Sequence, residues 1–296
     1  MKANNRSLPQ RNRNSPETSA VYNSRIIVAL SFLVAIIMIL PIYYMLYLSF
    51  SARGKEFAFP PTVIPKPFVV GNIVQAMKGD TLPLWPNFRN SLTYAGLATI
   101  GALLTESMVG FAFARLRFPG RKILFGITVG MLIMPFVVTL IPRFLLFKQF
   151  NMASGLTPLI LPVWFGGSPY GIFLMRQFFM SIPYQIDEAA KLDGAGPWRT
   201  LWLILMPQAL PVLVALGMLH FAYFWNDLLG PLIYAQKQDS KVLTQGIIFN
   251  FMSNWSPTWN LFMMASLLMI LPVAIVFLIL QRRFRQGFLF SGLGGR

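Results

Sequence analysis

Six long apolar stretches, separated by shorter polar and charged segments, dominate the pattern along the chain. The first, residues 26–48, contains 23 residues, and as a helix it would be about 35 Å long, enough to cross about 30 Å of hydrocarbon. A cleavable signal sequence has an apolar core of only about 7–15 residues, so we expect this stretch to remain as a membrane span. The other predicted spans are residues 91–114, 123–146, 157–179, 207–229 and 259–281. The pattern therefore predicts an all-α, polytopic membrane protein with six transmembrane helices.

The polar segments predict the domain organisation and the orientation of the spans. Residues 1–24 are rich in Asn, Ser and Arg, and we expect them to form a disordered tail. Residues 25–281 form the predicted transmembrane domain, and residues 282–296 form a C-terminal tail. If both ends lie inside the cell, the inside segments hold 16 of the 25 Lys and Arg residues, in less sequence than the outside segments. The positive-inside rule therefore predicts a multi-pass protein of the inner or plasma membrane with both termini cytoplasmic.

Composition strengthens the membrane prediction and argues against two other classes of protein. Hydrophobic residues make up 55% of the chain and charged residues only 11%, a balance typical of proteins surrounded by lipid. The net charge of +16 would also suit a nucleic-acid-binding protein, but the basic residues form short clusters between apolar runs and no continuous basic face. The chain has no Cys, one His and no G-x-x-x-x-G-K-[ST] phosphate-binding loop. We therefore expect no metal, no cofactor and no enzymatic activity in this chain.

One inside segment, about residues 181–207, is more elaborate than a connection between two spans requires. It contains "EAAKLDGAGPWRTLWLILMP", in which a first helix is expected to begin near Pro183 and to end before Gly194. Pro197 can open a second helix, whose large apolar side chains recur at helical spacing and predict one apolar face. These apolar residues are Trp198, Leu201, Trp202 and Leu205. The segment is predicted to be a helix–glycine–helix elbow that packs on a partner protein or lies as an amphipathic hairpin on the membrane.

The same segment closely resembles the EAA loop of the permeases of binding-protein-dependent ABC transporters. That pattern has Glu-Ala-Ala, then Asp-Gly-Ala, then an apolar stretch that ends in Leu/Met-Pro. The matching residues here are Glu188, Ala189, Ala190, Asp193, Gly194, Ala195 and Pro207. Two further segments, "FAFARLRFPGRKILF" and "FWNDLLGPLIY", look like the carbohydrate-uptake, maltose-type branch of the family. Within that branch the chain is similar to the smaller, six-span member of a pair of permeases.

The resemblance implies a function and a set of partners. It implies that the chain forms half of the pathway of a sugar importer, together with a second permease subunit, two copies of a cytoplasmic ATPase and an extracytoplasmic solute-binding protein. The elbow would enter a cleft of the ATPase as a coupling helix, and its motion would pass to the spans. Glu188 could pair there with a basic group. ATP hydrolysis would then belong to the partner and not to this chain.

A few polar residues within the predicted spans are candidates for a structural role or for lining the solute pathway. Glu106 lies inside the second span, where a carboxylate is costly and is expected to face the bundle interior or water. His220 lies inside the fifth span and is expected to be a packed, hydrogen-bonded residue. Trp225, Asn226 and Asp227 combine an aromatic ring with hydrogen-bonding groups, which is chemistry suited to a sugar, although interfacial packing explains them equally well.

Other functions stay open at the level of the sequence. The solute could be glycerol phosphate or a polyamine instead of a sugar. A secondary transporter would need coupling-ion sites and preferably an inverted repeat, and no repeat is visible in the sequence. A membrane scaffold without transport activity is the third alternative, and it would not bring an ATPase with it on purification.

Overall fold

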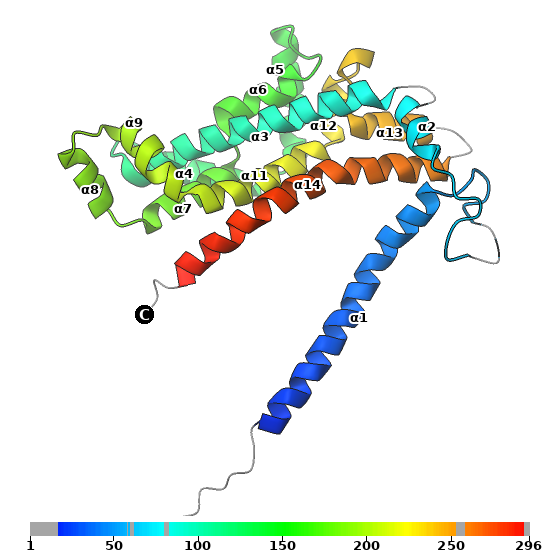
Figure 1. Ribbon diagram of the computed structural model, residues 1–296. Helices are drawn as coiled ribbons and strands as arrows, with labels where there is room; N and C mark the ends of the chain where they lie inside the picture. Colours follow the sequence, from blue (N-terminus) through cyan, green and yellow to red (C-terminus); the bar gives the residue numbers. More distant parts are fainter. Residues whose placement is uncertain (1–16, 58, 60–61, 80–82, 253–257, 293–296) are drawn as a thin grey trace, which may run out of the picture.

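The computed structural model describes residues 17–57, 59, 62–79, 83–252 and 258–292, with side chains between residues 27 and 281 (Figure 1). All regular secondary structure in these ranges is helical. The α-helices are α1 (Glu17–Ser49), α2 (Asn72–Lys78), α3 (Leu84–Arg115), α4 (Arg121–Gly130), α5 (Phe136–Gln149), α6 (Thr157–Gly166), α7 (Pro169–Ser181), α8 (Gln185–Leu192), α9 (Pro197–Arg199), α10 (Met206–Gln208), α11 (Leu210–Trp225), α12 (Leu229–Tyr234), α13 (Leu243–Phe251) and α14 (Trp259–Gly292). Short 3-10 turns lie at Met131–Ile133 and Gln238–Ser240, and a π-helical turn at Thr200–Leu205.

The described helices are consistent with the six predicted spans. Four segments are long and apolar enough to cross a membrane by themselves: Ile27–Ser49, Leu84–Arg115, Thr157–Ser181 and Trp259–Gln281. Two further pairs of helices pass the same test only if each bent pair is taken as one span. The fold is therefore an all-α membrane bundle with four candidate spans, or up to six if each strongly bent pair is one span.

Both broken spans are apolar stretches that the hydropathy pattern taken alone marks as single spans. The predicted span 123–146 bends by 108° between Ile133 and Phe136, because Met134 is extended in front of Pro135 and a helix cannot continue through that position. The predicted span 207–229 is interrupted at Ala209, where the axis bends by 79°. Hydropathy does not detect these breaks, because the residues on both sides of each bend are apolar.

The boundaries at the chain ends also differ from the prediction. Helix α1 begins at Glu17, so residues 17–24 of the predicted disordered tail are helical, while residues 1–16 lie outside the described residues. At the other end α14 continues to Gly292, so most of the predicted C-terminal tail extends the last helix. The predicted span 157–179 is formed by α6 and α7 in sequence, which are separated by Gly167 and Ser168.

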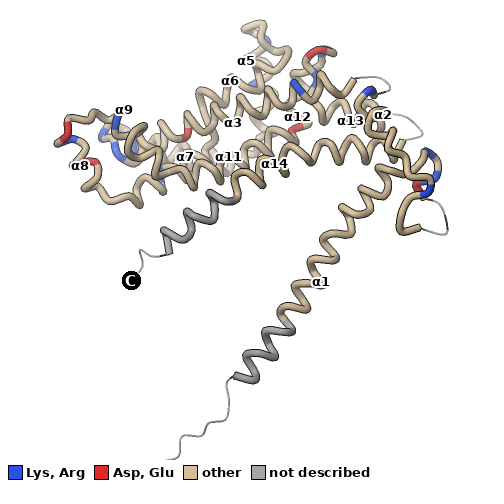
Figure 2. Tube along the Cα trace, in the orientation of Figure 1, with Lys and Arg blue, Asp and Glu red and all other residues tan. Residues whose placement is uncertain are grey.

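Helix α3 lies at the centre of the bundle and packs against α6, α7 and α11 (Figure 1). One hydrophobic core includes Trp225, Phe251 and Leu261 and lies around α3, α6, α13 and α14. A second core, which includes Phe111 and Phe179, lies where α7 and α11 approach the segment that joins them. Helix α1 diverges from the bundle and contacts α14. Most of the described Lys and Arg residues lie towards the ends of the bundle (Figure 2), which leaves the apolar middle for lipid.

Candidate functional site

The segment between α7 and α11 protrudes from one end of the bundle as a helical elbow (Figure 1). Its first helix, α8, is followed by Gly194, which has the left-handed conformation at φ +77°. The Ala195 N–H donates to the Ala190 carbonyl at 2.8 Å, and the Gly194 N–H donates to the Lys191 carbonyl at 3.0 Å. These two bonds form a Schellman motif, for which glycine is the favoured residue. The predicted helix end is confirmed, and so is the start of the second helix, where Pro197 is the first residue of α9.

The predicted apolar face of the elbow's second helix is divided between two environments. Leu201 and Leu205 are buried in the core below the elbow, whereas Trp198 is 63% exposed. The Trp198 ring contacts Trp202 edge to face, with 5.8 Å between ring centroids. The division follows from the π-helical turn at Thr200–Leu205, because a π-turn winds with more residues than the α-helical period on which the prediction rests.

A buried ion pair attaches the elbow to the end of α3. Arg115 Nη2 lies 3.3 Å from Asp187 Oδ2, and each side chain is only 7% exposed. The same Arg115 nitrogen donates to the Ile182 carbonyl at 2.8 Å, and the guanidinium lies 5.5 Å from the centroid of the Tyr184 ring. A cavity of about 410 Å³, lined by residues of α3 and of the elbow, lies beside the ion pair. The ion pair is therefore a principal connection between the elbow and the centre of the bundle.

The residues that resemble the EAA pattern lie on both the outer and inner surfaces of the elbow. Glu188 is exposed and has no ion-pair partner among the described residues, while Ala190, two positions on, is buried. Leu192 is 89% exposed. The remaining matches are exposed or half-buried: Ala189, Asp193, Gly194, Ala195 and Pro207. A free carboxylate beside two large exposed apolar side chains, Leu192 and Trp198, is a composition suited to a protein partner.

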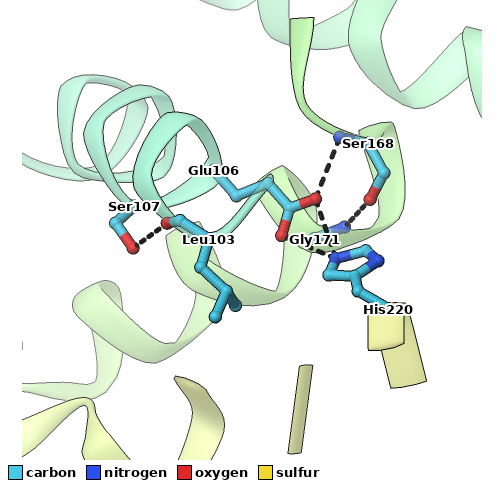
Figure 3. A network of polar contacts seen from close by, with 6 residues as sticks. All are labelled: Leu103, Glu106, Ser107, Ser168, Gly171 and His220. Atoms are coloured by element: carbon cyan, nitrogen blue, oxygen red, sulfur yellow. Dashed lines mark hydrogen bonds and ion pairs between the residues drawn. The ribbon is translucent and has the colours of Figure 1, made fainter. Parts of the chain in front are cut away.

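The polar residues of the spans are located in two separate places. Glu106 is fully buried and lies 3.0 Å from His220 Nε2 (Figure 3). Trp225 lies in the core, and its indole N–H donates to the Met269 carbonyl at 3.0 Å. Asn226 is exposed and donates to the Ala222 carbonyl of its own helix at 2.7 Å.

Asp227 alone of the Trp225–Asn226–Asp227 group lines a cavity, which has a volume of about 60 Å³. Its carboxylate accepts hydrogen bonds from the Tyr94 hydroxyl at 2.8 Å and the Gly230 N–H at 3.1 Å. Arg143 and Tyr234 line the same cavity. Burial raises the pKa of the Tyr234 phenol, and Arg143 opposes that rise. The sequence did not indicate Tyr94 or Arg143, because α3, α5 and α11 meet here only in the folded bundle.

The described part of the chain contains no group of three or more His, Asp and Glu residues that could hold a metal ion. The elbow and the two polar locations present ion pairs, hydrogen-bonding groups and exposed apolar side chains.

Comparisons with known proteins place this arrangement in context. Residues 106–289 match the family model described as binding-protein-dependent transport system inner membrane component. The sn-glycerol-3-phosphate transport system permease protein UgpE of Yersinia enterocolitica is 32% identical over 261 residues, which cover 85% of this chain and 92% of that protein. The diacetylchitobiose uptake system permease protein NgcG of Streptomyces coelicolor is 29% identical, and the match covers 86% of this chain and 84% of NgcG.

A solved structure shares the fold. A chain of a bacterial ABC transporter involved in the import of the acidic polysaccharide alginate superposes with a TM-score of 0.77 at 21% identity. The superposition covers 92% of this chain and the whole of the other. At this level of identity the likeness concerns the fold alone.

Proposed function

Since the chain belongs to the family of binding-protein-dependent transport system inner membrane components, we propose that it is one permease subunit of an ATP-driven sugar importer. The observation that carries the proposal is the elbow, which is attached to α3 by the buried Arg115–Asp187 pair and exposes Glu188 to a partner. A rigid helical elbow at the end of a bundle can pass force from a moving partner to the spans. Its position between α7 and α11 delivers that force to two of the helices around the central α3.

The proposal includes the partners that such a subunit needs. A second permease would complete the pathway, two copies of a cytoplasmic ATPase would bind the elbows of the two permeases, and an extracytoplasmic protein would deliver the solute. The dense basic segments at the elbow end of the bundle support a cytoplasmic location for the elbow and for both termini. The exposed apolar side chains of α1 support contact with lipid.

A sugar or oligosaccharide is the proposed solute. The similarity to a diacetylchitobiose uptake permease supports it. Glycerol phosphate is the second candidate. It is favoured by the 32% identity to a glycerol-3-phosphate permease.

Purification of the chain from its own membrane in mild detergent tests the proposal. We expect an ATPase that carries a phosphate-binding loop, and a second permease, to purify with it in fixed ratio. In liposomes, with the solute-binding protein outside and ATP inside, the complex should import the solute that the binding protein binds. Uptake that needs an ion gradient and no ATP would instead identify a secondary transporter, and a chain that purifies alone and transports nothing would support the scaffold.

A further inference from the structure

Glu106 connects three helices at one point inside the bundle (Figure 3). It belongs to α3, and its side chain is completely buried. Oε1 accepts a hydrogen bond from the backbone N–H of Ser168, at the start of α7, at 2.9 Å. His220 Nε2, from α11, lies 3.0 Å from both carboxylate oxygens. A single side chain therefore contacts both helices that flank the elbow.

The start of α7 is shaped around this carboxylate. A Cβ added at Gly171 would overlap the Glu106 carboxyl group, so the close approach requires glycine. The Gly171 N–H donates to the Ser168 hydroxyl at 3.0 Å, which caps the helix. The Ser168 N–H and the positive end of the α7 dipole favour an acceptor at this place. The carboxylate thus supplies an acceptor for a partly buried N–H at the start of the helix.

The connectivity of the chain gives this junction a mechanical consequence. Helix α7 leads into the elbow and α11 leads out of it, so the elbow has two arms, and both are hydrogen-bonded to Glu106. The end of α3 also binds the elbow directly, through the pair Arg115–Asp187. Helix α3 is therefore tied to the elbow at one level and to both of its arms at a second level inside the bundle.

We propose that Glu106 is a positioning residue that holds α3, α7 and α11 together as one rigid body. Movement of the elbow then moves all three helices at once. This inference rests on the proposed function. A purely packing role would be served as well by an apolar side chain, without the cost of burying a carboxylate in the membrane. A gate would need this contact to break during transport, whereas the proposed tie persists through the cycle.

The test is the ratio of solute imported to ATP hydrolysed, measured for the complete complex in liposomes. Glu106→Ala leaves the Ser168 N–H and His220 unpaired, and we expect the ratio to fall roughly tenfold while ATPase binding and hydrolysis are retained. Glu106→Gln keeps an acceptor for Ser168 and a donor for His220, and its ratio should stay within about twofold of the native value. Ser107→Ala is the matched control, because Ser107 is equally buried but bonds only to Leu103 of its own helix.

A native ratio for Glu106→Ala would overturn the tie, and so would a loss of transport that only parallels a loss of hydrolysis. If Glu106→Ala does not assemble, the same ratio is measured for His220→Phe. This substitution fills the space beside Phe224 and removes only the contact between α11 and Glu106. The native complex separates this inference from the proposed function. A native chain that neither binds an ATPase nor imports solute contradicts the function, whereas coupling in the native complex with an unchanged ratio in both variants contradicts the tie alone.

Discussion

Replacing Asp187 by alanine is expected to release the elbow from α3. The change leaves the Arg115 guanidinium buried without its counter-charge, which typically costs about 3–5 kcal/mol. Because the pair joins the elbow to the bundle, the cost should appear as local opening of α8 and not as unfolding of the spans. Hydrogen exchange of the α8 amides should then become roughly a hundredfold faster or more.

Two further variants show whether the ion pair itself is responsible. Asp193→Ala removes an exposed acid of the same elbow that has no ion-pair partner among the described residues, and its exchange should be nearly native. The double variant Arg115→Met/Asp187→Leu replaces the pair by apolar side chains, which is often neutral for a buried pair, and it should recover most of the protection. Equal exchange in Asp187→Ala and Asp193→Ala would show that the pair does not hold the elbow.

Replacing Glu188 by glutamine is expected to disable coupling without loosening the elbow. Glu188 lies in the first turn of α8, where loss of a favourable interaction with the helix dipole costs only about 0.3–1 kcal/mol. If the exposed carboxylate pairs with a basic group of the ATPase, loss of one partner of a desolvated pair costs about 2–5 kcal/mol. ATP hydrolysis coupled to transport should therefore fall severely in the reconstituted complex.

A charge exchange between the two proteins identifies the ATPase residue that pairs with Glu188. Glu188→Lys combined with an acidic substitution at the matching ATPase residue should restore part of the coupled hydrolysis. Glu188→Gln that transports at the native rate would reject the ion pair. The turn at Gly194 and the exposed apolar side chains Leu192 and Trp198 would then have to form the contact with the ATPase alone.

The parts of the fold that depend on local signals could be predicted from the sequence. Gly194 after a run of good helix formers indicates a helix end, and Pro197 after it indicates a helix start, and the structure has both at these residues. The bends at Met134–Pro135 and Ala209 also have local signals, since Pro135 and Pro211 are residues that kink or end a helix. Hydropathy alone does not detect them, because it averages over a window. The division of the apolar face of the elbow's second helix was not predicted, since the prediction assumed the α-helical period and the structure has a π-helical turn there.

The connections between distant residues could not be predicted. Arg115 and Asp187 are far apart in the chain, and Glu106 and His220 are 114 residues apart. The sequence identified Glu106 and His220 as unusual in their surroundings, but it contained no signal that pairs one with the other. Asp187 stands beside the Glu-Ala-Ala motif and was not singled out, although a buried carboxylate needs a partner and the chain has only 9 acidic residues.

Contact between the elbow and the ATPase is tested by a cross-link from the exposed end of α8. The chain contains no Cys, so Leu192→Cys introduces a unique thiol at a position that is 89% exposed. Val63→Cys is the matched control, since Val63 is 77% exposed and lies in the loop between α1 and α2, at the other end of the bundle (Figure 1). With a thiol-to-amine cross-linker, we expect an adduct with the ATPase from position 192 and none from position 63. An intact complex in which position 192 gives no ATPase adduct, or in which position 63 gives one, would contradict this expectation.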